Sequence, residues 1–286
     1  MKELIEKIEK KLDEYIPVIY PEEIFESMRY SVLAGGKRLR PIMCLEACRV
    51  LGGNIEKAIP TACAFEMLHT QSLIHDDLPC MDNDDYRRGK LTNHKKFSES
   101  TAVLAGDALI SFGIQLIIEK SELPAETIIK VLKEYALAAG AYGIIAGQVV
   151  DIAMEGKPYN AETLEYIHTH KTADLFKAVL KSGAIIANAT DEQIKAMNDF
   201  GQNLGFAFQI CDDILDEVST FEEMGKTLGK DKNAGKLTYT ALFGLDKSKC
   251  KVNCLLDESC DILKRQNINS DIFNKIISSI KEKVNR

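Results

Sequence analysis

The stretch TAVLAGDALISFGIQLII, residues 101–118, carries apolar side chains around almost its whole circumference when it is read with a helical period. Residues 137–152 have the same character, and residues 128–136 place apolar side chains at the i, i+3, i+4 and i+7 positions of a helix. A helix that is apolar on every side belongs in the middle of a bundle, where other helices surround it. No run shows the alternation of a strand between turn signals. The sequence therefore predicts an all-α fold with residues 101–118 and 137–152 at its centre.

Turn-forming residues divide the rest of the chain into long helical segments. The helical patterns are roughly 15 to 30 residues long, which exceeds the usual length of a globular helix. We find no linker, no low-complexity tract and no repeat with a solenoid period. We therefore predict one domain, residues 1–286, built as a single large helix bundle. The breaks fall at residues 35–36, 52–53, 79, 89–92, 123–124, 156–159 and 225–235.

The composition is that of a soluble globular protein and disfavours a nucleic-acid binder. Of the 286 residues 45% are hydrophobic, and the formal net charge is -7, whereas proteins that bind nucleic acid are usually basic. The N-terminus is an amphipathic, charged stretch rather than a secretory signal, and we read no apolar run as long enough to span a bilayer. We therefore expect a cytoplasmic protein without a stable membrane anchor.

The eight cysteines are expected to be free thiols, because the chain shows no sign of secretion. Cys44 and Cys48 are four residues apart, as are Cys250 and Cys254, so each pair lies on one helix face. Two ligands of a metal site are one interpretation, but no Cys/His pattern completes either site. We expect both pairs to be buried by packing.

The first acidic cluster is HDDLPCMDNDD, residues 75–85, and it follows the apolar helical stretch 65–74. Pro79 cannot sit in a helix interior, so the helix is expected to stop near Asp76 and Asp77. The carboxylates would then crowd the negative end of the helix dipole, where a bound cation would stabilise them. Hard cations such as Mg2+ take oxygen ligands and bridge carboxylates to substrate phosphates.

The second acidic cluster is CDDILD, residues 211–216, and it also follows an apolar helical stretch. Asp212 and Asp216 are one turn apart on one face, where like charges destabilise a bare helix. Either cluster alone could be a solvated helix end. Two such clusters after apolar helices indicate a polynuclear metal site across the bundle.

Basic residues supply the other half of a phosphate-binding site. Three cations stand on a glycine-led turn in GGKRLRP, residues 35–41, and RRGK, residues 87–90, directly follows the first acidic cluster. Arginine recognises phosphate with a planar, bidentate fork, and lysine acts as a point charge. Each cation alone could be a solvated surface residue, but together they favour a ligand rich in phosphate and metal. The remaining candidates are Lys171, Lys226, Lys230 and Lys236.

With these motifs the chain resembles the trans-isoprenyl diphosphate synthase family, which includes the farnesyl and geranylgeranyl diphosphate synthases. The resemblance covers about residues 25–248, and the two aspartate motifs with Arg87 and Arg88 after the first are specific in combination. It implies a helix bundle around a deep central cavity, and a homodimer that acts on small-molecule isoprenoid diphosphates. The motifs are GGKRLRP (35–41), SLIHDDLPCMDNDDYRRGKLTNH (72–94), GDAL (106–109), Lys171-Thr172, FQICDDILD (208–216) and GKTLGKDKNAGKLTY (225–239).

The resemblance also implies a role for each matching residue. Typically three Mg2+ ions, for which Mn2+ can substitute, are held by Asp76, Asp77, Asp82, Asp212, Asp213 and Asp216. The pocket for isopentenyl diphosphate is formed by Lys37, Arg40, His69 and Arg88. The allylic substrate is contacted by Arg87, Lys171, Thr172, Gln209, Lys226 and Lys236, among which Lys171, Thr172 and Gln209 act at the reacting centre. The chain departs from the family at Ala173, where glycine is usual.

Product length is expected to depend on the helix before the first aspartate motif. Ser72 lies four residues before Asp76 on the same face, and Gln71 beside it lies one turn above Met67. In bacterial farnesyl synthases the residue that matches Gln71 is usually aromatic. We expect a farnesyl diphosphate synthase that extends dimethylallyl or geranyl diphosphate, with geranylgeranyl diphosphate as the alternative product.

Other functions fit the sequence less well. A terpene cyclase ionises the same substrates, but it binds no second diphosphate, and its second metal motif contains Asn and Ser or Thr. A non-catalytic partner subunit commonly loses one aspartate motif, whereas this chain keeps both. A purely structural bundle leaves both acidic clusters unexplained.

Overall fold

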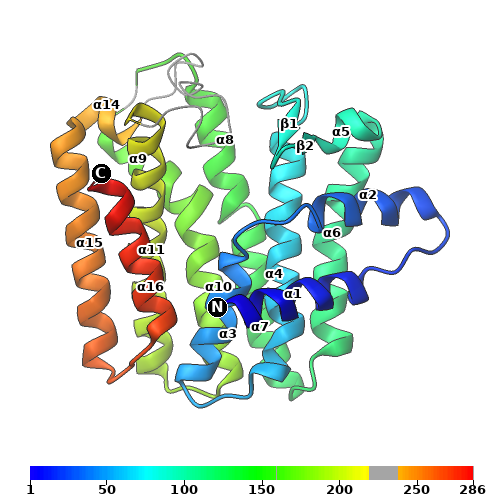
Figure 1. Ribbon diagram of the computed structural model, residues 1–286, viewed down its shortest axis with the longest axis horizontal. Coiled ribbons are helices and arrows are strands. Elements are labelled where there is room, and N and C mark those ends of the chain that lie inside the picture. The colour runs from blue at the N-terminus through cyan, green and yellow to red at the C-terminus, as the bar shows by residue number, and fades with distance from the viewer. Residues whose placement is uncertain (159, 219–237, 286) are drawn as a thin grey trace.

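The computed structural model describes residues 1–158, 160–218 and 238–285, and it confirms the all-α fold. Most of the helices pack side by side with their axes roughly aligned, while the first two run across them (Figure 1). They are α1 (Lys2–Tyr15), α2 (Glu22–Val32), α3 (Leu39–Val50), α4 (Ile55–Asp76), α5 (Asn93–Lys96), α6 (Glu99–Lys120), α7 (Ala125–Ala139), α8 (Ile144–Met154), α9 (Ala161–His168), the π-helix η1 (Thr169–Ala173), α10 (Asp174–Ile186), α11 (Asp191–Val218), α14 (Tyr239–Phe243), α15 (Leu245–Arg265) and α16 (Asp271–Val284).

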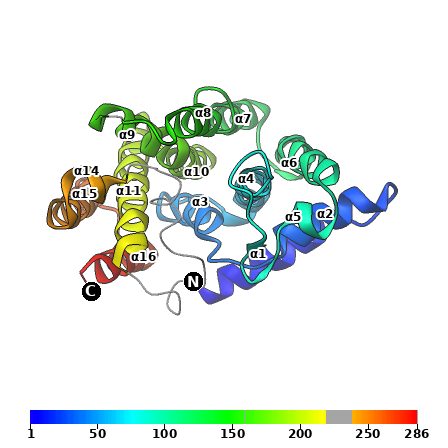
Figure 2. The same cartoon turned by 90° about the horizontal axis from the view of Figure 1, so that it is seen from above.

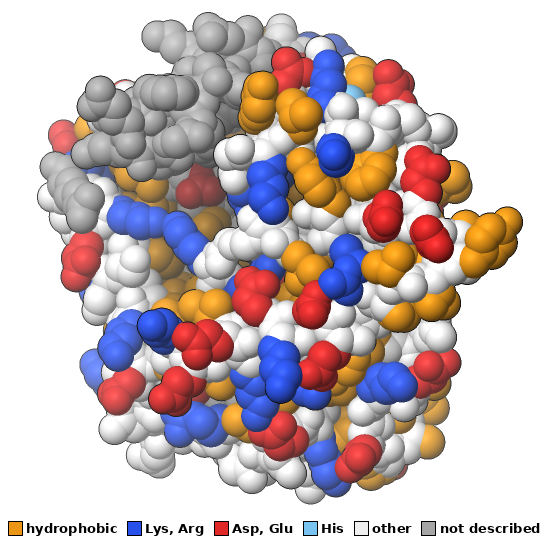
Figure 3. Space-filling model, turned by 45° about the vertical axis from the view of Figure 1, so that its right-hand side comes forward, with side chains coloured by type: hydrophobic (Ala, Val, Ile, Leu, Met, Phe, Trp, Pro, Cys, Tyr) orange, Lys and Arg blue, Asp and Glu red, His pale blue; other side chains and the backbone are white. Residues whose placement is uncertain are grey.

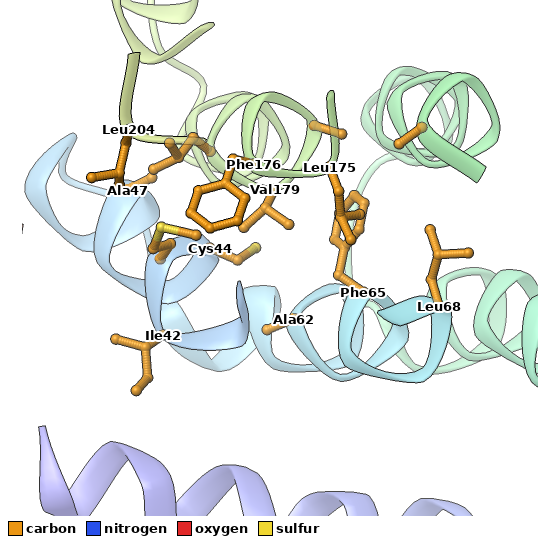
Figure 4. Packing of buried hydrophobic residues seen from close by; sticks show 14 of the residues in the cluster. Ile42, Cys44, Ala47, Ala62, Phe65, Leu68, Leu175, Phe176, Val179 and Leu204 are labelled. Atoms are coloured by element: carbon orange, nitrogen blue, oxygen red, sulfur yellow. The ribbon is translucent and has the colours of Figure 1, made fainter. Parts of the chain in front are cut away.

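The centre of the bundle is formed by α3, α4 and α10, which other helices surround (Figure 2). Every residue of α3 from Pro41 to Cys48 is buried. Phe65 of α4 and Phe176 of α10 point into the same core, where Leu204 of α11 joins them (Figure 4). Because α4 and α11 pack around this core, the residues at their ends are fixed relative to one another.

The prediction that residues 101–118 and 137–152 form the centre was wrong. Helix α6 lies at one side of the bundle (Figure 2), and Leu104 is 58% exposed. On α8, Val149 is 61% exposed. Both stretches therefore leave apolar side chains on the surface of a single chain.

We expected no apolar run long enough to span a bilayer, but two stretches have the length and composition that a membrane-spanning helix needs. Residues Glu99–Lys120 and Ala125–Met154 reach mean hydropathies of 1.8 and 1.5 over an 18-residue window. Only 39% and 28% of these windows are buried. Two such helices are weak evidence for a membrane segment, because helices of soluble bundles have the same composition.

The apolar stretch 137–152 is two helices rather than one. Helix α7 ends at Ala139 and α8 begins at Ile144. A Cβ at Gly143 would lie 2.4 Å from the Ala138 carbonyl oxygen, so glycine permits the tight turn that separates the two helices. Hydrophobic periodicity alone could not reveal this break.

A small hairpin, which the sequence did not predict, follows the first acidic cluster. Strand β1 (Tyr86–Arg87) pairs antiparallel with β2 (Lys90–Leu91). The two residues between them, Arg88 and Gly89, have φ angles of 53° and 75°. Positive φ at both central residues is what a type I′ hairpin turn requires. The hairpin sets the positions of Arg87 and Arg88.

The prediction about the cysteines was correct for one pair and wrong for the other. Cys44 and Cys48 are buried, and burial raises the pKa of the Cys44 thiol well above its usual value. Cys250 and Cys254 are exposed on α15. The same four-residue spacing therefore occurs on a buried and on an exposed helix face.

Candidate active site

The first aspartate motif lies where α4 ends, as Pro79 predicted. Asp76 is the last residue of the helix, and the backbone N–H of Asp82 donates to its carbonyl oxygen at 2.8 Å, which folds the loop back. Gln148 of α8 donates from Nε2 to Oδ1 of Asp76 at 2.8 Å. Burial raises the pKa of Asp76 to about 6, although the Lys171 ammonium acts in the opposite direction. Asp76 is thus a half-buried carboxylate with a cation near it.

The second carboxylate of this motif already has a partner. Asp77 is 2% exposed, and it accepts from Arg87 at 2.8 and 2.9 Å through Nε and at 2.6 Å through Nη2. Burial raises the pKa of Asp77, and the Arg87 guanidinium opposes that shift. This fork-to-fork pair joins the hairpin to the end of α4. Its geometry suits a residue that orients the motif.

Three of the four residues assigned to the isopentenyl pocket, His69, Arg40 and Arg88, lie close together. Burial lowers the pKa of His69, and the guanidinium groups of Arg40 and Arg88 lower it further. Arg40 lies 5.3 Å from the ring centroid of Phe176, and its Nε is buried without a hydrogen-bond partner among the described residues. Burial lowers the pKa of Arg40 to about 10. A cationic pocket with an unpaired buried donor is suited to an anionic ligand.

Glycines let the hairpin approach this pocket. Arg88 donates from Nη1 to the carbonyl oxygen of Gly35. A Cβ at Gly36 would lie 2.8 Å from Cζ of Arg88, and Gly36 has a φ of 134°. The glycine pair before Lys37 therefore serves both the turn and the close approach.

Arg38, the middle cation of the same motif, has a structural role. It is 1% exposed and donates to Glu66 at 2.8 Å and to Glu9 at 2.6 Å. These ion pairs tie α1 and α4 to the start of α3. The basic motif therefore divides into a buried structural arginine, an arginine beside His69, Arg40, and an exposed lysine, Lys37.

Sequence reasoning missed Lys283, which lies on α16 near the other end of the chain. Burial lowers the pKa of Lys37, and the nearby Lys283 ammonium lowers it further. Two ammonium groups in contact repel each other unless an anion lies between them. Nothing in the sequence around Lys283 marked it, because its neighbours in space are far from it in the chain.

The π-helix η1 carries the Lys171-Thr172 pair. Wider π turns inside α-helical segments often occur at functional sites. Lys171 donates from Nζ to Oδ2 of Asp151 at 2.6 Å, and a Cβ at Gly147 would lie 2.2 Å from the Lys171 backbone nitrogen. Helix α8 thus packs directly on η1. Thr172 donates from Oγ1 to Oε1 of Gln209 at 2.8 Å, which joins η1 to α11.

The second aspartate motif lies near the end of α11. Asp213 is 5% exposed and accepts from the backbone N–H of Tyr239 at 2.7 Å and from Nε2 of Gln209 at 3.3 Å. The Nε2 atom of His168 lies 3.4 Å from Oδ2 of Asp213, the same oxygen that accepts from Tyr239. Asp213 is therefore held by three elements. Asp212 and Asp216 are partly exposed on the same turns of the helix.

The structure brings the two motifs to one end of the bundle (Figure 1). Asp212 is close enough to raise the pKa of Lys37 by its charge, and Lys171 acts on Asp76 in the opposite sense. Across residues 1–158, 160–218 and 238–285, no three His, Cys, Asp or Glu side chains are grouped to hold a metal ion by themselves. Substrate phosphate oxygens would have to complete the coordination, as is usual for Mg2+.

The remaining predicted residues are Gln71 and Ser72 on α4, and two lysines that the structure does not describe. Gln71 is 8% exposed, and its Nε2 lies 3.0 Å from Nδ1 of His75. Ser72 is partly buried and donates to the His69 carbonyl oxygen at 2.9 Å. Lys226 and Lys236 lie outside the described residues.

Polar residues outside the motifs also contact the site. Gln148, Asp151 and His168 each contact one of the predicted residues, while Glu66 pairs with the structural Arg38. Glu66 could have been found from the sequence, because a carboxylate inside an apolar helix needs a cationic partner. The other three occur in segments whose neighbours cannot be read from the sequence.

The chain matches known proteins over nearly its whole length. Residues 21–279 match the polyprenyl synthetase family. The chain is 49% identical over 257 residues to the dimethylallyltranstransferase of Fischerella ambigua, covering 89% of this chain and 74% of that protein. It is 47% identical over 276 residues to geranylgeranyl pyrophosphate synthase 4 of Arabidopsis thaliana, covering 96% of this chain and 73% of that protein.

Solved structures agree with the fold. The apo FPP/GFPP synthase of Zymomonas mobilis superimposes with a TM-score of 0.89 at 32% identity, covering 98% of this chain and 97% of that one. The geranyltransferase of Helicobacter pylori, solved with magnesium and isoprenyl diphosphate, gives a TM-score of 0.85 at 33% identity over 98% of this chain and 94% of that one. The chain therefore belongs to the polyprenyl synthetase family, and it is a trans-prenyltransferase with the isoprenoid synthase fold.

Proposed function

We propose that this chain is a geranylgeranyl diphosphate synthase, which adds isopentenyl diphosphate to an allylic diphosphate until the product has twenty carbons. Relatives that are 46 to 51% identical are named mainly as geranylgeranyl synthases, and this observation carries the proposal. It replaces the expectation of farnesyl diphosphate as main product. Gln71, in place of the aromatic residue expected for a bacterial farnesyl synthase, is consistent with the longer product.

The residues present fit Mg2+ as the cofactor. Asp76 keeps one carboxylate oxygen outside its hydrogen bond with Gln148, and its burial opposes ionisation, which a divalent cation would reverse. Asp76, Asp82 and Asp212 are the residues that would hold the metal, while Asp77 and Asp213 would orient them. The bound metal would stabilise the charge that develops on the leaving diphosphate.

The chain's own residues would bind and orient the two substrates. Lys37, Arg40 and Arg88 would hold isopentenyl diphosphate, with neutral His69 as a hydrogen-bonding partner. Lys171, close to Asp76, would hold the allylic diphosphate. Thr172 and Gln209, joined to each other, would present oxygen dipoles to the cationic carbon chain, which must be kept from water. The departing diphosphate would take the final proton.

A second copy of the chain would cover the exposed apolar residues of α6 and α8. Leu104 and Val149 are 58% and 61% exposed, and patches of this kind commonly mark an interface.

On the face in Figure 3, acidic and basic side chains are interspersed over the lower half, which gives no surface of uniform positive charge that would attract nucleic acid. We propose a cytoplasmic homodimer without a membrane anchor.

Chromatography of the products tests the assignment. Wild-type protein with Mg2+, dimethylallyl diphosphate and excess isopentenyl diphosphate should give mainly geranylgeranyl diphosphate. Gln71→Tyr should shorten the product, and Thr70→Ser, one residue away on another face, should leave it unchanged. Farnesyl diphosphate as the sole wild-type product would contradict the chain length, and no turnover would contradict the function.

A further inference from the structure

Gln71 and His75 form a directional hydrogen-bonded chain between α4 and α6. The Nε2 atom of Gln71 lies 3.0 Å from Nδ1 of His75, and Nε2 of His75 lies 3.1 Å from the carbonyl oxygen of Val103. A carbonyl oxygen only accepts, so the neutral imidazole carries its proton on Nε2. Its Nδ1 is then the acceptor for the Gln71 amide. The amide is therefore held by its NH2 group.

The structure of α6 makes this contact possible. A Cβ at Gly106 would lie 2.0 Å from Nε2 of His75, so any other residue there would push the ring away. Gly106 is itself fully buried within α6. The ring therefore sits against the α6 backbone in a space that only glycine leaves open.

This contact ties the Gln71 amide to the residue one turn toward the carboxyl end of α4. Side chains four residues apart lie on the same face of a helix, so Gln71 and His75 can meet without leaving that face. Met67 and Leu68, both fully buried, lie one turn below.

We infer that His75 is a positioning residue that holds the Gln71 amide against α6, out of the path of the growing prenyl chain. The inference rests on the proposed function, in which the chain descends along α4 past Gln71. Without the acceptor at Nδ1, the amide is released from its place beside α6 and obstructs the last extension. Product length then depends on a residue that touches neither diphosphate.

Four variants test the inference. His75→Leu removes the acceptor, and the ratio of geranylgeranyl to farnesyl diphosphate should fall by about fivefold, the effect of one lost hydrogen bond. His75→Asn places an amide oxygen near the position of Nδ1, and it should restore most of the ratio. Gln71→Met removes the amide but keeps a long side chain. In the double variant with His75→Leu, the His75 substitution should therefore have no further effect on product length.

The outcomes separate this inference from the proposed function. An unchanged product ratio in His75→Leu would overturn the role of His75 while leaving the enzyme's function intact. The same conclusion would follow if His75→Leu changed the ratio equally in the wild-type background and in the Gln71→Met background. Loss of turnover in the wild-type protein would overturn the function itself. The side chain of His75 is 26% exposed, so thermal unfolding should show that each variant folds.

Discussion

At the scale of single residues, the site contrasts carboxylates that have several partners with Asp76, which forms no ion pair with the residues that the structure describes. Asp77 and Asp213 are each held by several donors, whereas the half-buried Asp76 accepts one hydrogen bond, from the Gln148 amide. The hydrogen bonds of Asp77 and Asp213 fix the direction of their helix ends. Asp76 is the residue whose charge is least favourable without a metal, and this makes it the most informative position for stability measurements.

The raised pKa of Asp76 has a consequence for stability in the absence of metal. Its pKa is about 6 in the fold and near 3.8 in the unfolded chain, so the native state binds more protons between these values and stability falls as the pH rises through them. Asp76→Asn should therefore stabilise the metal-free protein at pH 7, by roughly 1 to 3 kcal/mol. Thermal unfolding with a chelator should show this gain shrinking toward pH 4. A variant that is less stable at pH 7 would contradict the burial argument.

Lys283 gives a second test at this scale. It lies close enough to Lys37 to lower the pKa of that ammonium, so we expect both groups to bind one diphosphate. Lys283→Ala should then raise the KM for isopentenyl diphosphate by about tenfold, the loss expected for a hydrogen bond to a charged group. The KM for the allylic substrate should change little. Lys281→Ala, on the same helix but paired with Asp257 at 2.5 Å, is the matched control. An equal rise in this KM for both variants would mean that Lys283 acts only through the overall electrostatic potential of the protein and does not bind the diphosphate.

At the scale of elements, the close packing of α8 on η1 is the feature most sensitive to substitution. Gly147 lets the α8 backbone approach Lys171, while Gly183 of α10 similarly faces the Cys44 carbonyl oxygen of α3, where a Cβ would lie 2.3 Å away. These two glycines make comparable close contacts, but only one lies beside the reacting centre. Substitutions at Gly147 and Gly183 therefore distinguish a loss of stability caused by overpacking from a loss of activity caused by displacing η1.

Gly147→Ala and Gly183→Ala should each destabilise the protein by about 1 to 3 kcal/mol through overpacking. Only Gly147→Ala should also lower kcat, because it displaces Lys171 and Thr172. Steady-state kinetics at a temperature where both variants are folded makes the comparison. A similar fall in kcat for both would show that η1 is not specifically positioned by α8.

Sequence patterns predicted where helices end better than they predicted which helices lie at the centre of the bundle. Pro79 located the end of α4, and the aspartate and basic motifs were brought to one end of the bundle, as the resemblance implied. Position within the bundle failed for α6, because a helix that leaves apolar residues on the surface has the same composition as a central one. The hydrogen bonds of Asp77 and Asp213, and the contact of Lys283, depend on residues distant in sequence. No local pattern encodes them.

At the scale of the whole molecule, the exposed apolar face of α6 predicts a dimer. Leu104→Glu should shift the protein from dimer to monomer in light scattering coupled to size exclusion, because a charge would be buried at the interface. Tyr166→Glu, at a residue of α9 that is 41% exposed on another side of the bundle, is the control. A wild-type monomer, or a Leu104→Glu dimer of unchanged affinity, would contradict this interface.

The central claim is that the two aspartate motifs act together in one metal-dependent condensation. The most direct measurement is the incorporation of labelled isopentenyl diphosphate with Mg2+ by the wild type, Asp76→Asn and Asp212→Asn. Both variants should lose about two to three orders of magnitude in turnover, as expected when a charge-stabilising group is removed, while remaining folded. Near-normal turnover in either folded variant would contradict the claim, because one motif would then act without the other.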